Sequence, residues 1–200
     1  MKHFLTAGMT IASIFLWNAT SSANLVVNGG FETGDFSGWT TIPASTGSLF
    51  GVWDISPHSG TYDANFGGIT SGAYDGISQT LSTVAGTSYN VSFWLMNDNT
   101  PPSSFQAYWG GNQILTIDQA NPFSYTQYTF TETATSNSTA LLFQGYQVPG
   151  YFYLDDVSVT PTTSAVPEPS TLAMAGVAGL AGLAYSLLRR RLRGAEARCS

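Results

Sequence analysis

Ten carboxylates lie between Asn24 and Val166, and no lysine or arginine accompanies them in this part of the chain. Acidic side chains without cationic partners attract divalent ions, and Ca²⁺ in particular prefers oxygen ligands. The same charge repels nucleic acids and anionic lipid head groups, so neither is an expected partner. A plainer interpretation stays open for most of these acids, namely that they keep an acidic surface hydrated.

Groups for catalysis are scarce in the same region. His58 is its only histidine, so a histidine-ligated metal site or a Ser-His-Asp arrangement would depend on that residue alone. Asp155 and Asp156 are neighbours that an extended strand points to opposite faces, whereas a glycosidase needs two carboxylates that face each other. We therefore predict that the protein is not an enzyme, with a small glycosidase as a remaining alternative.

Residues 1–23 have the pattern of a signal peptide. Lys2 supplies the positive start, an apolar stretch runs from Phe4 to Trp17, and small residues precede Asn24 at the expected cleavage point. The apolar stretch is too short for a comfortable membrane span. The sequence therefore predicts export across the inner membrane.

The C-terminal region has three parts, which follow a short linker at residues 161–165. The first part is a stiff motif without helical character, Val166-Pro167-Glu168-Pro169. The second, residues 171–188, is an uncharged apolar run that is just long enough to cross a bilayer as a helix. The third is a cluster of arginines that would hold this end in the cytoplasm, with residues 194–200 as a cytoplasmic tail. The signal peptide and this segment predict the same orientation, with the domain outside.

The tail at residues 166–193 resembles the PEP-CTERM sorting signal of Gram-negative bacteria. A Pro-Glu-Pro triplet followed at this spacing by an apolar span and an arginine cluster is a specific combination. The resemblance implies recognition by an exosortase-type membrane protease, cleavage near the triplet after transient anchoring in the inner membrane, and transfer to the cell surface or extracellular matrix. An ordinary permanent anchor is the alternative interpretation.

Between Asn24 and Thr160 the hydrophobic pattern is that of strands. Residues 89–97 alternate between two faces, and residues 105–109 and 113–117 flank a Gly-Gly-Asn sequence that is typical of a hairpin turn. Further alternating runs follow up to residue 159. The sequence therefore predicts an all-β domain, an antiparallel jelly-roll β-sandwich, flanked by the signal peptide and a C-terminal hydrophobic helix.

Two signatures bracket the domain at residues 24–160. They are Asn28-Gly29-Gly30-Phe31-Glu32 near its start and Leu154-Asp155-Asp156-Val157 at its end, with Pro57-His58-Ser59-Gly60 between them. Together they resemble the galactose-binding-like jelly roll, especially its carbohydrate-binding modules. The resemblance implies that the first and last strands lie side by side and that the domain binds its ligand without cleaving it.

The resemblance also implies a structural Ca²⁺ that ties the first and last strands together. Its ligands would be the carbonyl of Gly30 and the carboxylates of Glu32 and Asp156, with Asp54 from a neighbouring loop. Alternation along the last strand predicts that Asp156 faces inward, where an unpaired carboxylate is costly. In the alternative, backbone N–H groups satisfy Glu32 and Asp156 without a metal.

Aromatic side chains in such a module stack on sugar rings, and nearby amides bind the hydroxyl groups. We nominate Trp53 and Trp109, with Tyr108 beside the predicted hairpin turn, as ligand-binding residues. Gln106, Gln144 and Gln147 are candidate hydrogen-bonding partners of the ligand. Aromatic residues of a sandwich can alternatively serve only the core.

The predicted function is that of an exported, non-catalytic protein that binds polysaccharide at the cell surface or in the extracellular matrix. A structural or adhesive protein of the biofilm matrix is the first alternative. Ice binding is a weaker one, because the threonines of the domain show no regular spacing.

Overall fold

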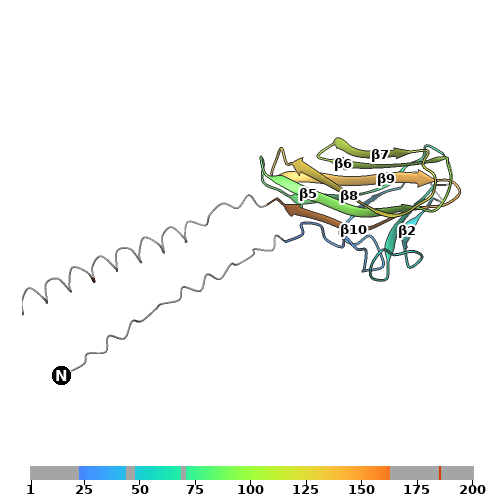
Figure 1. The fold of residues 1–200 in the computed structure, drawn as a ribbon, viewed down its shortest axis with the longest axis horizontal. Coiled ribbons are helices and arrows are strands. Elements are labelled where there is room, and N and C mark those ends of the chain that lie inside the picture. The colour runs from blue at the N-terminus through green and yellow to red at the C-terminus, as the bar shows by residue number, and fades with distance from the viewer. Residues whose placement is uncertain (1–22, 44–47, 69–70, 163–184, 186–200) are drawn as a thin grey trace, which may run out of the picture. The chain divides into compact units, whose positions relative to one another are not determined.

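The computed structural model describes residues 23–43, 48–68, 71–162 and Tyr185. Two antiparallel five-stranded sheets pack face to face over residues 40–161 and confirm the predicted sandwich (Figure 1). Sheet A has the strand order β1-β4-β9-β6-β7, and sheet B has the order β2-β3-β10-β5-β8. The strands are β1 (Thr40–Ile42), β2 (Leu49–Trp53), β3 (Asp63–Gly67), β4 (Asp75–Ser82), β5 (Ser88–Asn97), β6 (Ser103–Trp109), β7 (Asn112–Asp118), β8 (Phe123–Thr133), β9 (Ser138–Gln147) and β10 (Phe152–Pro161).

Strict alternation builds the central strands of both sheets. In β5 every second residue from Tyr89 is buried, so Val91, Phe93 and Leu95 face the other sheet as the sequence predicts. The predicted hairpin joins β6 to β7, and both of its glycines, Gly110 and Gly111, have positive φ angles, a conformation that glycine adopts at little cost.

Aromatic rings from the two sheets interdigitate in the core. Phe93 of sheet B meets Phe143 of sheet A edge to face at 4.9 Å, and Phe105 of sheet A lies 5.4 Å from Phe152 of sheet B. All four rings are fully buried, and each such burial contributes about 1.5–3 kcal/mol. This packing fixes how the sheets lie on each other and thereby which side chains remain on their outer faces.

The N-terminal segment of the domain runs beside the last strand, as the resemblance implies. Leu25 N donates to Val159 O, and Val157 N donates to Gly29 O. The Asn24 side chain adds a bond, because its Oδ1 accepts from Val159 N at 2.8 Å. The chain entry is therefore attached directly to β10.

The predicted signal peptide and sorting tail lie outside the described residues, apart from Ala23 and Tyr185, which are both exposed. Val166, Pro167, Glu168 and Pro169 are among the residues not described. Within the described part of the chain, no helix has both the length and the apolar character needed to cross a membrane.

Candidate functional site

The outer face of sheet A carries a row of polar side chains across its middle. Gly76 of β4 is paired with Gln144 of β9, which is paired in turn with Gln106 of β6. Because their sequence neighbours Phe143, Phe105 and Ala107 fill the core, alternation points both glutamines outward. Two amides from distant parts of the chain are thus brought side by side.

Hydrogen bonds fix the orientation of these amides. Gln106 Oε1 accepts from Gln144 Nε2 at 2.7 Å and from the Tyr108 hydroxyl at 2.8 Å. Gln106 Nε2 makes a longer contact of 3.4 Å with the Tyr74 hydroxyl, which itself donates to Ser104 Oγ at 2.9 Å. Ser104 Oγ also donates to Asp118. A connected network such as this one holds its donors and acceptors in place before a ligand arrives.

Tyrosine rings border the network. Tyr74 and Tyr146 meet edge to face at 5.1 Å, and Tyr108 lies half-buried on the same face. The resulting surface combines aromatic rings, amides and hydroxyls, the groups that bind the apolar faces and the hydroxyl groups of a sugar. Tyr108 is thus partly exposed on this face, with Gln106 and Gln144 beside it, and its nomination as a ligand-binding residue stays a prediction.

The structure contradicts the prediction that Trp109 binds a ligand. Its side chain is only 2% exposed, because it continues the inward series of Phe105 and Ala107. The ring packs at 5.7 Å against Tyr89 in the core. A buried ring offers no face to a sugar, so the nomination of Trp109 as a ligand-binding residue is wrong and its role is structural.

Trp53 lies on the other sheet. It ends β2 and packs edge to face against Tyr151 with a centroid distance of 5.7 Å. Its position on sheet B separates it from Tyr108 on the outer face of sheet A. The structure therefore does not bring the predicted ligand-binding residues together.

Three of the four predicted calcium ligands, Gly30, Glu32 and Asp156, lie where the chain entry, β10 and the segment at residues 58–62 come together; we call this place the acidic junction. Glu32 accepts hydrogen bonds from the backbone N–H groups of Thr61 and Tyr62, at 2.9 and 3.1 Å. Asp156 accepts from Ser59 Oγ at 2.7 Å. A methyl group built on Gly30 would lie 3.7 Å from Asp156 Oδ1 and 3.8 Å from Glu32 Cγ, which places Gly30 between the two acids.

Asp155, which sequence reasoning did not nominate, is the buried acid of the acidic junction. It is 0% exposed and accepts from the backbone N–H groups of His58 and Ser59, at 2.9 and 3.0 Å. Burial raises the pKa of Asp155 to about 6. The Asp-Asp doublet in the last strand was the available signal, but it does not say which of the two acids is buried.

The prediction that Asp156 faces inward is wrong. A bulge between Asp155 and Ser158 interrupts the pairing of β10 with β5, and Asp156 has a φ of 49° there. The bulge adds a residue, so Val157 and Val159 return to the core while Asp156 turns out toward the segment at 58–62. Its carboxylate lies 2.6 Å from His58 Nδ1 and is half-buried.

The donor types at the acidic junction fit Ca²⁺, because the ion takes carboxylate and carbonyl oxygens. Glu32 and Asp156 bring carboxylates to the neighbourhood of Gly30, whose carbonyl is the third oxygen that the resemblance implies. Asp54 is exposed, and among the described residues no three acidic, histidine or cysteine side chains form a group that could hold a metal. Three of the four predicted ligands are thus brought together, and Asp54 does not complete a third carboxylate.

The segment at residues 54–62 also covers part of the outer face of sheet B. His58 stacks on Trp94 with a centroid distance of 3.9 Å and an angle of 16°. Tyr125 closes over His58 edge to face at 5.0 Å and donates its hydroxyl to Ser56 O. Trp94 is therefore occupied by the protein's own histidine.

Comparison with protein families assigns the domain. The CBM_4_9 family, described as a carbohydrate binding domain, matches residues 23–145. The chain belongs to the CBM_4_9 family. A PEP-CTERM protein-sorting motif matches residues 165–191, which confirms the resemblance of the tail. The CBM_4_9 chain thus combines a carbohydrate-binding domain with the PEP-CTERM motif of an exported, sorted protein.

Solved structures confirm the fold of the CBM_4_9 domain. The complex of TmCBM61 with β-1,4-galactotriose has a TM-score of 0.56 at 19% identity and covers 70% of this chain and 99% of its own. The xylan-binding CBM22-1 domain of Paenibacillus barcinonensis Xyn10C has a TM-score of 0.51 at 15% identity, covering 74% and 99%. The K3 cleaved adhesin domain of Lys-gingipain from Porphyromonas gingivalis has a TM-score of 0.55 at 18% identity, covering 70% and 99%. No curated protein matches the chain.

Proposed function

We propose that the domain binds a neutral polysaccharide through the outer face of sheet A. The observation that carries this proposal is the hydrogen-bonded group of Gln106, Gln144 and Tyr108 in the middle of that face. Because Gln106 Oε1 already serves two donors, the remaining amide and hydroxyl groups are held in fixed directions. A sugar chain that crosses the strands would meet tyrosine rings and oriented amides together.

Charge favours a neutral ligand over an acidic one. The domain has ten carboxylates and no lysine or arginine between residues 24 and 166. A polysaccharide rich in uronic acid or sulfate would be repelled, and no cationic side chain would compensate the repulsion. Related structures with bound β-1,4-galactotriose and with a xylan-binding module suggest neutral oligosaccharides as the first ligands to test.

The test is a binding screen on residues 24–162, which include both sheets and their shared core. The panel contains β-1,4-galactotriose, xylohexaose and other neutral oligosaccharides, and isothermal titration measures the hits. We expect Gln106→Ala to weaken binding about tenfold or more, because it removes the acceptor that orients Gln144 and Tyr108. Thr131→Ala, on exposed β8 of sheet B, is the control. Unchanged affinity in Gln106→Ala, with the control also unchanged, would remove sheet A as the site.

We also propose that the protein has no catalytic activity. Asp155 and Asp156, the adjacent acids that a glycosidase interpretation would use, both bind the segment at 58–59. They do not face each other across an open surface, as a pair that cleaves sugars must. Release of reducing ends from any glycan that the domain binds would contradict this part of the proposal.

Calcium at the acidic junction is a separate structural proposal. Gly30, Glu32 and Asp156 would hold the ion, which would offset the repulsion between carboxylates at the entry of the chain. The residues of the domain itself position these oxygens, through the bulge at Asp156 and the backbone N–H groups that orient Glu32.

For the whole chain we propose processing by an exosortase-type protease and delivery to the cell surface or matrix. The PEP-CTERM motif at residues 165–191 supports this path. Fractionation of cells that produce the full chain should find mature protein outside the inner membrane. Deletion of residues 166–200 should change its amount or place, and an unchanged distribution would contradict the proposed sorting.

A further inference from the structure

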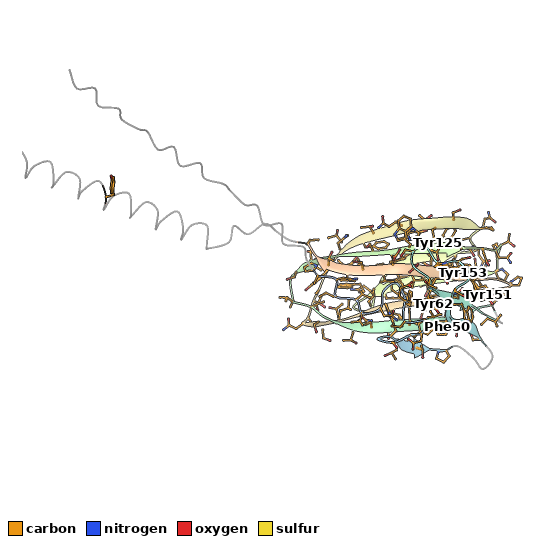
Figure 2. All side chains as sticks on the ribbon, turned by 90° about the horizontal axis from the view of Figure 1, so that it is seen from below. Phe50, Tyr62, Tyr125, Tyr151 and Tyr153 are labelled. Atoms are coloured by element: carbon orange, nitrogen blue, oxygen red, sulfur yellow. The ribbon has the colours of Figure 1, made fainter. Side chains whose placement is uncertain are left out.

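The outer face of sheet B carries a second group of aromatic rings, on β2, on β10 and on Tyr151, which directly precedes β10. The Tyr151 ring lies between the other two, with centroid distances of 5.7 Å to Trp53 and 5.9 Å to Tyr153. Figure 2 shows Tyr151 and Tyr153 near each other at one end of the sandwich. Trp53 and Tyr151 are half-buried, whereas Tyr153 is 4% exposed. We call these three residues the sheet B rings.

Two of the sheet B rings lie on glycines. A methyl group built on Gly51 would stand 2.8 Å from Cζ2 of Trp53, and one built on Gly67 would stand 2.4 Å from Cε1 of Tyr151. The absence of side chains at these positions lets each ring approach the backbone closely. The two rings stand nearly perpendicular to each other, at 83°, and both residues remain partly exposed. Partly exposed aromatic rings on the outer face of a sheet suit the apolar face of a sugar.

Asn65 of β3 places an unused acceptor among the same rings. It is paired with Gly51 on one side and Tyr153 on the other, and it is 0% exposed although it points away from the core. Its Nδ2 donates to the backbone and side chain of Asp63, at 2.9 and 3.1 Å. Within the described residues its Oδ1 accepts no hydrogen bond. Because Asn65 is fully buried, a ligand hydroxyl does not reach this acceptor, and the partly exposed rings carry the contact.

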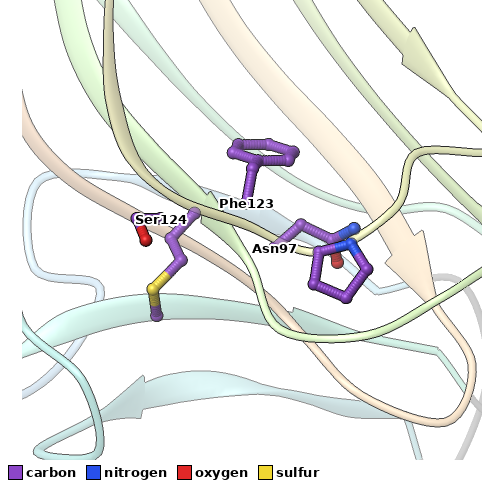
Figure 3. Close-up of a pocket in the computed structure, with 5 residues that line it drawn as sticks. Asn97, Phe123 and Ser124 are labelled. Carbon is purple, nitrogen blue, oxygen red and sulfur yellow. The ribbon is translucent and has the colours of Figure 1, made fainter.

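The surroundings of the sheet B rings extend the surface and define its charge. Tyr153 is paired with Met96, which lines a shallow cavity of about 240 Å³ together with Pro122 and Ser124 (Figure 3). The Tyr153 hydroxyl donates a hydrogen bond to Asp98 Oδ2 at 2.8 Å. The nearby charges of the described residues are therefore acidic, which excludes polyanionic glycans and favours a neutral chain.

We propose that Trp53 and Tyr151 form a second contact for a neutral polysaccharide. The idea deepens the proposed function, on which it rests for the class of ligand. The two faces belong to opposite sides of the sandwich, so one domain would hold two separate chains. A domain of this kind cross-links polysaccharide, and it gains avidity on a dense matrix without any additional contact.

The test compares single substitutions on the two faces in residues 24–162, by affinity electrophoresis in gels that contain xylan, β-1,4-galactan or β-glucan. We expect Trp53→Ala and Tyr151→Ala to lower retention at least threefold and Trp53→Phe to restore part of it. Melting temperatures verify that each variant is folded. Gln106→Ala removes the sheet A contribution, and the double variant Trp53→Ala/Gln106→Ala should lose retention altogether.

Tryptophan emission reports the sheet B rings directly. Trp39 and Trp109 are buried and Trp94 lies under His58, so a ligand on these rings changes chiefly the emission of Trp53. We expect xylan fragments or galactan fragments to shift the emission of the wild type and of Gln106→Ala. The shift should disappear in Trp53→Phe.

Each outcome separates the two proposals. Wild-type retention by Trp53→Ala and Tyr151→Ala, with loss in Gln106→Ala, overturns the second contact and leaves the site on sheet A. Loss in Trp53→Ala with no effect of Gln106→Ala supports the sheet B rings and removes sheet A as the site. A folded wild type that none of the gels retains contradicts both.

Discussion

The outer faces of the two sheets both carry tyrosines, but they hold them by different means. On sheet A, hydrogen bonds through Gln106 hold Tyr108 by its hydroxyl edge. On sheet B, Trp53 and Tyr151 pack closely over glycines and against each other, without a hydrogen bond between them. An edge held by hydrogen bonds presents oriented polar groups, whereas rings held by packing present apolar surface. The first arrangement suits hydroxyl groups and the second suits the apolar side of a sugar.

Substitution of single glycines by alanine provides the strongest test of this comparison. In Gly67→Ala the new methyl group would meet the Tyr151 ring at 2.4 Å and the backbone oxygen of Leu49 at 2.8 Å. We expect a loss of about 1–3 kcal/mol in the free energy of unfolding, measured by urea denaturation. The matched change Gly76→Ala on sheet A meets its nearest atom, the Phe143 oxygen, at 3.2 Å and should cost clearly less.

A double variant assigns the cause of that loss. Tyr151→Ala removes the ring over Gly67, so Gly67→Ala should cost less in the Tyr151→Ala background than in the wild type. The contact with the Leu49 oxygen remains and should keep part of the cost. If the two changes are simply additive, the ring does not rest on Gly67, and the contrast between the two faces loses its basis.

Calcium should act on the side of sheet B, because the acidic junction positions the segment that carries His58 over Trp94. After treatment with EDTA, added Ca²⁺ should raise the melting temperature of residues 24–162 by a few degrees, through preferential binding to the folded state. Asp156→Asn should abolish the rise. Asp54→Asn is the matched control and should keep it, because Asp54 is exposed and does not complete a group of three acids. A wild type that does not respond to Ca²⁺ contradicts the proposed ion.

The strands of the domain could be predicted because alternation is a local property. In β5 the sequence alone shows which residues share a face, and the Gly-rich turn between β6 and β7 is equally local. Trp109 shows the limit of such reasoning. Alternation groups it with Phe105 and Ala107, yet its place beside a turn suggested exposure, and only the packing of the other sheet shows that it is buried.

The candidate sites depend on strand order, which alternation does not reveal. Gln106 and Gln144 lie 38 residues apart in sequence and meet only because β6 pairs with β9. Trp53 ends β2 and Tyr151 directly precedes β10. These two strands flank β3 in sheet B, and this strand order brings the two rings together. The bulge at Asp156 is a further case, since one extra residue turns Asp156 away from the core, whereas Asp155 keeps its regular pairing with Trp94.

The pH dependence of stability provides the test with the smallest expected effect. It reports on Asp63, the buried carboxylate beneath the sheet B rings. Burial raises its pKa from 3.8 to about 6, against the lowering effect of hydrogen bonds from Asn65 and Tyr125. The folded protein therefore holds the proton more tightly than the unfolded chain does. This stabilisation is complete below the unfolded pKa and is lost as the pH rises through about 6. Asp155, whose pKa burial also raises to about 6, contributes in the same direction.

The domain should therefore melt at a higher temperature near pH 5 than near pH 7.5, in buffers that contain EDTA. Asp63→Asn keeps the shape of the side chain but cannot titrate, so the difference between the two pH values should shrink by a degree or more. Asp54→Asn removes an exposed carboxylate and should leave the difference as it is in the wild type. If Asp63→Asn and Asp54→Asn behave alike, the acid beneath the sheet B rings is not held in a desolvated place. Solvent would then reach Asp63, and the sheet B rings would be more open than their packing on glycine indicates.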